Sequence, residues 1–127
     1  GECAGVVIDL VATLLLEALE KLDLGQEALE QGRWSDSIYH HYAGLINAAK
    51  ALLLSEDTST NSYANIISLF DEKFVESGKI NLEGTFAEKV YQINQHEPTE
   101  EFAHAYAKQA MEVYSLLKTY REEEVEA

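Results

Sequence analysis

The chain has 127 residues and a formal charge of −14, from 23 acidic and 9 basic residues. This length is that of one domain with an ordinary core, so we expect a single domain over residues 1–127. The negative charge argues against nucleic acid or an anionic membrane as partner, because both are negatively charged themselves. A basic partner protein would be attracted.

The only cysteine, Cys3, cannot form an internal disulfide or a cysteine-rich metal site. We expect it to be a small buried or terminal residue rather than a reactive thiol, and we expect a reducing, cytoplasmic location. The opening GECAGVVIDL has no Met, no basic region and no apolar run long enough to span a bilayer. It predicts the C-terminal fragment of a longer protein rather than a signal peptide.

Apolar residues recur three or four positions apart, which predicts helices throughout the chain. The first helix is expected over residues 5–31. Gly25 would allow a bend in it, and Gly32 would stop it. The second helix is expected to begin at Ser35, as the N-cap, and to end near Ser55.

The second predicted helix has apolar residues on one side and small residues on the other, which is typical of a central helix. We expect its main stripe to be buried, at Tyr42, Leu45, Ala49 and Leu52. Gly44, Ala48 and Ala51 would let a neighbouring helix or a partner chain approach closely.

Three further helices follow. The first of them begins at Tyr63 and stops near Gly78, and a short one opens with a capping box, Thr85 to Glu88. The last begins at Thr99, after Pro98, and the acidic residues 121–127 are expected to fray. The chain is therefore predicted to be all-α, an antiparallel four-helix up-down bundle with one short extra helix.

The histidines are the candidate chemical groups. Asp36 and His40 share a helix face, as a charge pair at the helix start or as two metal ligands. His41 borders the apolar stripe and is expected to be packed. His96 precedes Pro98 and is expected to cap the preceding helix, although it could be catalytic.

Two classes of function remain open from the residues. One is a helical interaction domain without a catalytic or metal site. The other is a small-molecule or nucleotide pocket between helices, with polar contacts from Tyr39, His40, Asn47 and His96.

The segment GRWSDSIYHHYAGLINAAKALLL, Gly32–Leu54, resembles the helical-hairpin start of the HEPN family. The segment FAEKVYQINQHEPTEEFAHAYAKQAMEVYSLLK, residues 86–118, is similar to the family's second half. The resemblance implies the helical fold of that family.

Catalytic HEPN members are metal-independent ribonucleases that use an arginine followed four to six residues later by a histidine. His96 matches the histidine, but Tyr91 and Gln92 stand where the arginine would lie, and no arginine lies between Arg33 and Arg121. Phosphoryl transfer needs a cation to stabilise the developing charge. The resemblance therefore implies a non-catalytic member, with a divergent ribonuclease as a further alternative.

The opening GECAGVVIDLV resembles the segment that joins sulfite- or nitrite-reductase-type proteins to a C-terminal HEPN-like domain. This resemblance implies that siroheme and an iron–sulfur cluster belong to an upstream part and that this segment holds no cofactor. The expected partners are a second copy of the chain, as in a dimer, or the parent reductase.

Overall fold

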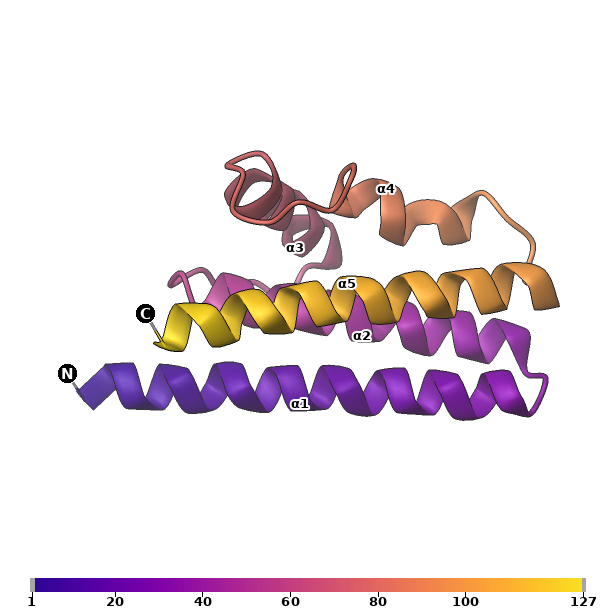
Figure 1. The fold of residues 1–127 in the computed structure, drawn as a ribbon, viewed down its shortest axis with the longest axis horizontal. Coiled ribbons are helices and arrows are strands. Elements are labelled where there is room, and N and C mark those ends of the chain that lie inside the picture. The colour runs from indigo at the N-terminus through magenta and orange to yellow at the C-terminus, as the bar shows by residue number, and fades with distance from the viewer. Residues whose placement is uncertain (1, 127) are drawn as a thin grey trace.

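The computed structural model describes the backbone of residues 2–126 and the side chains of residues 5–126, so the Cys3 side chain lies outside the described residues. Within that range the chain forms helices and no strand, which confirms the all-α prediction. Three long helices lie along the molecule: α1 (Glu2–Glu30), α2 (Trp34–Leu54) and α5 (Glu100–Glu126) (Figure 1). Helix α1 runs opposite to both α2 and α5.

The turn between α1 and α2 is a Schellman motif. Gly32 has φ +74° and donates its N–H to the Leu29 carbonyl at 3.1 Å, while Arg33 N–H reaches the Ala28 carbonyl at 2.9 Å. Gly32 thus ends the first helix as predicted. The prediction of Ser35 as the N-cap is wrong, because Arg33 both closes α1 and caps α2, without a side-chain hydrogen bond.

A shorter layer covers α2 and α5 on the side away from α1 (Figure 1). It contains α3 (Tyr63–Phe70), which continues into a π-helical turn (Asp71–Val75), and α4 (Phe86–Val90), which continues into a 3₁₀ turn (Tyr91–Asn94). Together with its π-helical turn, α3 is the fourth helix of the predicted bundle and is shorter than the other three, and α4 is the short extra helix. The α3 segment ends at Val75, near Gly78 with its φ of +83°, as predicted.

Side-chain caps position the shorter layer. Thr85 accepts a hydrogen bond from Glu88 N–H at 3.0 Å, and Thr99 accepts one from Phe102 N–H at 3.1 Å, so both predicted helix starts are confirmed. The buried Asp71 adds a cap from outside the helix. Its two carboxylate oxygens accept from the N–H groups of Phe86 (2.7 Å) and Ala87 (3.0 Å), the first residues of α4.

Helix α2 is central, as predicted, because it contacts α1, α3 and α5. Leu45, Ala49 and Leu52 are fully buried. A Cβ atom at Gly44 would lie 2.9 Å from a methyl group of Leu22, so the small face of α2 does meet α1. Tyr42, expected to be buried, is only half-buried. It lies at the edge of the core, with its ring 5.9 Å from that of the exposed Tyr63.

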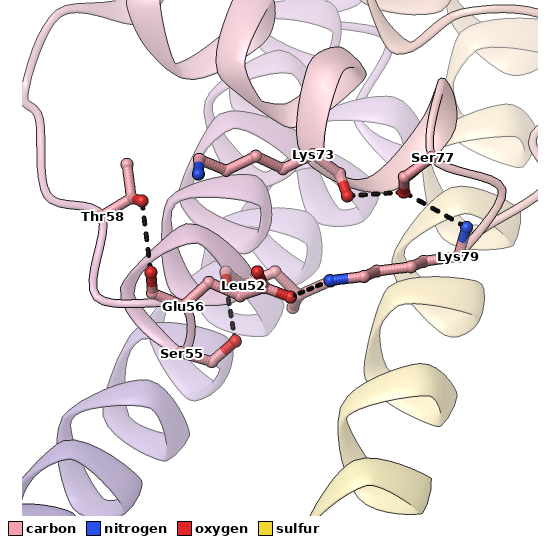
Figure 2. Close-up of polar contacts among 7 residues, drawn as sticks. All are labelled: Leu52, Ser55, Glu56, Thr58, Lys73, Ser77 and Lys79. Carbon is pink, nitrogen blue, oxygen red and sulfur yellow. Dashed lines mark hydrogen bonds and ion pairs between the residues drawn. The ribbon is translucent and has the colours of Figure 1, made fainter.

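Polar contacts fasten the end of α2 to the segment after α3 (Figure 2). Lys79 Nζ lies 2.6 Å from a Glu56 carboxylate oxygen, and this hydrogen bond raises the pKa of Lys79. The Ser77 hydroxyl donates to the Lys73 carbonyl at 2.6 Å, and the Ser55 hydroxyl donates to that of Leu52. Only the Lys79–Glu56 pair joins the two segments, since both serine bonds are local, and an ion pair this exposed contributes little stability.

Helix α5 continues through Glu126, so the acidic residues 121–126 are helical in the structure. Fraying of that end in solution stays a prediction. None of the described helices is long and apolar enough to cross a membrane.

Candidate functional site

The four residues predicted to bind a ligand lie in different settings. Tyr39 is 60% exposed, and its ring centroid lies 5.9 Å from that of the half-buried His40. The side-chain amide of Asn47 donates to the Leu14 carbonyl of α1 at 2.7 Å. His96 lies in the loop before α5. The Asn47 amide therefore joins α2 to α1 through a hydrogen bond. Of the four residues, His96 lines a hollow.

The start of α2 carries an ion pair that differs from the expected one. Arg33 Nη1 lies 2.9 Å from Asp36 Oδ2, and both side chains are about half-exposed. Asp36 thus pairs with Arg33 rather than orienting His40. An exposed pair of this kind has a small effect on stability, and it indicates no catalytic role.

His41 is a buried packing residue, as predicted. Its Nδ1–H donates to the Ser37 carbonyl one turn earlier, at 2.8 Å. The imidazole lies against Gly25 of α1, where a Cβ atom would come within 2.5 Å of Nδ1. Burial lowers the pKa of His41, with a smaller contribution from neighbouring His40. The hydrogen bond to Ser37 acts in the opposite direction on the pKa but is outweighed by burial, which favours the neutral ring.

His96 stacks on an aromatic ring instead of capping the preceding helix. Its ring centroid is 4.6 Å from that of Phe102, with 19° between the planes. A hollow of about 390 Å³ adjoins this stack, lined by Gln92, His96, Thr99, Glu101, Phe102 and Ala105. This lining carries a carboxylate and no lysine or arginine. The His96 hollow could accept a small polar or aromatic group, but it offers an anion no cation.

Metal binding has no support in the described part of the chain. Among those residues, no group of three histidine, cysteine, aspartate or glutamate side chains comes close enough together to hold an ion. His40 and His41 are adjacent in α2 and therefore point to different sides of that helix.

A second hollow runs between α1 and the C-terminal part of α5. This α1–α5 groove has a volume of about 420 Å³. Its α1 wall is apolar and consists of Ile8, Val11, Ala12, Leu15, Leu16 and Leu19. Its α5 wall carries Tyr114 and Val125 together with four charged residues, Lys118, Arg121, Glu122 and Glu126.

Helix α1 is tied to both neighbours at adjacent carbonyl groups. The Asn47 amide from α2 binds the Leu14 carbonyl, and the Tyr114 hydroxyl from α5 donates to the Leu15 carbonyl at 3.2 Å. Tyr114 thus forms a buried polar contact beneath the α1–α5 groove. Burial raises the pKa of its hydroxyl, with smaller contributions from Glu122 and Asp23.

Comparison with known proteins identifies the family. The model of the HEPN domain matches residues 11–123, which is most of the chain. The chain belongs to the HEPN family. A HEPN-like fold and the resemblance drawn from Gly32–Leu54 and residues 86–118 are thereby confirmed at the level of the family.

One similar protein is the UPF0332 protein PH1297 of Pyrococcus horikoshii, which is 36% identical over 72 residues. The match covers 57% of this chain and 46% of that protein, so the chain spans about half of its relative's length. No solved structure matches the chain. The link to a sulfite or nitrite reductase is not addressed by these matches.

Membership of the HEPN family makes the surroundings of His96 informative. The positions four to six residues before it hold Val90, Tyr91 and Gln92. Val90 is buried in α4, and the Gln92 side-chain oxygen accepts a hydrogen bond from Gln109 at 3.2 Å. None of these three side chains brings positive charge to His96.

Sequence reasoning missed two features of the site. One is the cap that Asp71 provides for α4, since an acid within a helical pattern gives no sign of a partner 15 residues away. The other is the α1–α5 groove. The unusually wide apolar face of residues 8–22 was the available signal, because such a face needs more than one neighbour to cover it.

Proposed function

We propose that this HEPN domain is a non-catalytic interaction domain that acts by self-association or by docking to another protein. The observation that carries the proposal is the apolar surface of α1. Its exposed large side chains are Val6, Ile8, Leu10, Leu16 and Leu24. Scattered apolar residues are normal on a surface, whereas apolar side chains gathered along one hollow, as Ile8 and Leu16 are along the α1–α5 groove, are typical of a binding surface.

The proposal of a non-catalytic domain is supported by the His96 hollow. Its lining includes Glu101 but no cation, and the positions where a catalytic HEPN protein would carry arginine hold Val90, Tyr91 and Gln92. A transition state of phosphoryl transfer would be left without electrostatic stabilisation there. The charge of −14 opposes binding of RNA as well.

An RNA cleavage assay tests this proposal. The purified chain is incubated with single-stranded RNA without added metal, beside a His96→Ala variant. We expect no cleavage above background by either protein. Cleavage by the parent chain that disappears in His96→Ala would overturn the proposal, because the hollow would then be an active site despite its missing arginine.

We also propose that the domain is appended to a sulfite- or nitrite-reductase-type protein, whose siroheme and iron–sulfur cluster would lie upstream. The support is the resemblance of the opening GECAGVVIDLV alone. The open reading frame that encodes the chain tests it. Upstream cysteine clusters with the spacing of an iron–sulfur site are expected, and an upstream sequence without them would refute the fusion.

The alternative function is a small-molecule or nucleotide site. The His96 hollow is the best location for it, since the stacked rings of His96 and Phe102 offer an aromatic surface. Thermal unfolding with a panel of nucleotides tests it. This function requires a rise in melting temperature that is lost in Phe102→Ala, and no response to the panel would remove it.

A further inference from the structure

We infer that the α1–α5 groove is a docking site for one amphipathic helix of a different protein, with lysine or arginine along the edge of its apolar face that meets α1. The inference rests on the proposed function, because it names the surface and the partner chemistry of that interaction domain. It is argued from the shape, the exposed apolar area and the charge of the groove.

The shape of the groove fits a helix. Its wall on α1 extends over the 12 residues from Ile8 to Leu19, a rise of about 16 Å at 1.5 Å per residue. The lining residues on α5 recur at helical spacing from Tyr114 to Val125. Two ridges of this length leave a channel that accepts about three turns of a third helix.

The side chains of the groove are exposed although they are apolar. Ile8 is 45% exposed, Leu16 is 57% exposed and Val125 is 51% exposed. They form the open edge of a wall whose deeper residues, Val11 and Leu15, belong to the core. Covering these side chains would remove apolar surface from water, which is the main driving force for docking a helix into a groove.

The edge of the groove is mostly acidic. On α1, Asp9, Glu20 and Asp23 are exposed and fall on the same side of the helix as Leu16. On α5 the lining is mixed, with Glu122 and Glu126 beside Lys118 and Arg121, and Lys118 lies 3.8 Å from Glu122. The excess of acidic charge therefore lies on the α1 side of the channel.

This charge selects the occupant. A second copy of the chain would bring another −14 charges to an acidic edge, so self-association through the groove is opposed by repulsion. An apolar helix without charge would gain nothing from the edge. A helix whose apolar face is bordered by basic residues makes apolar contacts with the wall of the groove and ion pairs with the acidic residues at its edge.

Titration with synthetic helical peptides tests the inference. The probe is a peptide of about 18 residues with leucine along one face, at the spacing of an amphipathic helix, and lysine on one border of that face. One control has the same composition in scrambled order. The other replaces every lysine by glutamate. Binding to the whole chain is measured by fluorescence anisotropy.

Two matched pairs of variants locate the binding. Leu16→Glu lies in the groove, and Leu24→Glu places the same change at a similarly exposed residue of α1 that does not line it. Glu122→Lys and Glu123→Lys make the same change of charge in adjacent residues, of which only the first lines the groove. Circular dichroism confirms that each variant is folded.

We expect the lysine peptide to bind at least about tenfold more tightly than either control, and Leu16→Glu to weaken it about tenfold while Leu24→Glu changes it less than about twofold. Glu122→Lys should weaken binding more than Glu123→Lys does. Raising the salt from about 0.05 M to about 0.5 M should weaken it several-fold.

Equal binding of the scrambled peptide, or equal effects within either pair of variants, would overturn the inference. Sedimentation of the chain alone separates this failure from that of the proposed function. A dimer that Leu16→Glu dissociates would show that a second copy occupies the groove, so the basic helix would be wrong while the interaction function stands. RNA cleavage that depends on His96 would instead overturn the function itself.

Discussion

On its α2 side, helix α1 packs so closely that a methyl group has no room, whereas on its α5 side the same helix leaves an open groove. The close contact depends on glycine at two places, Gly25 beneath His41 and Gly44 beside Leu22. The open side has large side chains, and the hydrogen bond from Tyr114 to the Leu15 carbonyl bridges the two helices.

The difference shows how one helix can serve both the core and a surface. Small residues let two helix backbones approach closely, and the neighbouring side chains then fill the remaining space around the contact. Large residues at the edge of the core keep α5 further away and remain available to a partner. The α2 side should therefore respond to changes of volume, and the α5 side to changes of surface chemistry.

The largest expected effect separates the core from the groove. Leu45→Ala should lower the free energy of unfolding by about 2–5 kcal/mol, because Leu45 is fully buried in α2. Leu16→Ala should change it by less than about 0.5 kcal/mol, since that side chain is largely exposed. Denaturation with urea measures both.

His40→Ala, with a half-buried imidazole, serves as a control in the same helix, with an expected cost of about 1 kcal/mol or less. A collapse of the fold in His40→Ala, with Leu45→Ala tolerated, would mean that α2 is built around its histidine rather than its leucines.

The next effect tests the close contact itself. Gly25→Ala should destabilise the chain by about 1–3 kcal/mol, because the added methyl group would meet the buried ring of His41. In a His41→Ala background the ring is absent, and the same change should stabilise by up to about 1 kcal/mol through helix propensity. This change of sign in a double-mutant cycle is the result to seek.

Gly5→Ala is the matched control for that cycle, since a Cβ atom there would meet nothing within 4 Å. It should be neutral or stabilising in both backgrounds. If Gly25→Ala has the same effect with and without His41, the two helices do not meet through this pair.

The pH dependence of stability is the third test of the α1–α2 contact. Because burial lowers the pKa of His41, the unfolded chain takes up the proton at a higher pH than the folded chain does. The stability due to the neutral ring is therefore complete above the usual histidine pKa of about 6.5 and is lost as the pH falls toward the folded value. Unfolding curves between about pH 5 and pH 7 lie above the main carboxylate range and record this loss.

His41→Gln should flatten that profile, whereas His104→Gln, which alters an exposed histidine of α5, should leave it unchanged. An identical loss of stability in His41→Gln would assign the pH dependence to other groups.

The sequence predicted much of this fold because most of its signals are local. Gly32, Gly78, Thr85 and Thr99 end or begin helices through contacts within a few residues. The central place of α2 was predicted from its apolar side and its opposite side of small residues. The Ser35 cap failed because a neighbouring Schellman turn had already used Arg33. Asp71 was missed because its partners lie in another helix.

The candidate site was less predictable for the same reason. His41 was expected to be packed, but its contact with Gly25 was not predicted. Gly25 was interpreted as a possible bend in the first helix, because the sequence does not show which side chain packs against a glycine. Asn47 was assigned to a ligand site because the sequence does not show its actual partner. That partner, the Leu14 carbonyl, lies 33 residues away along the chain. The α1–α5 groove depends on the distance between two helices, which periodicity alone does not give.

The smallest expected effect concerns the bridge on the open side. Tyr114→Phe removes the hydroxyl that donates to the Leu15 carbonyl and should cost about 0.5–1.5 kcal/mol, the usual net contribution of one hydrogen bond. The ring remains, so the core volume is unchanged. Asn47→Ala, at the adjacent carbonyl, tests the corresponding bond on the α2 side.

Tyr114→Phe and Asn47→Ala are expected to lower the free energy of unfolding by similar amounts. Amide hydrogen exchange shows in addition which side of α1 each variant loosens. In Tyr114→Phe, the amides of α5 near Val125 should exchange faster while those of α2 stay protected, because the change loosens α5 from α1 without disturbing the glycine contacts. In Asn47→Ala, faster exchange is expected at the α1–α2 contact instead. Uniformly faster exchange in both variants would mean that α1 holds its neighbours as one unit, and the contrast between a sealed side and an open side would be lost.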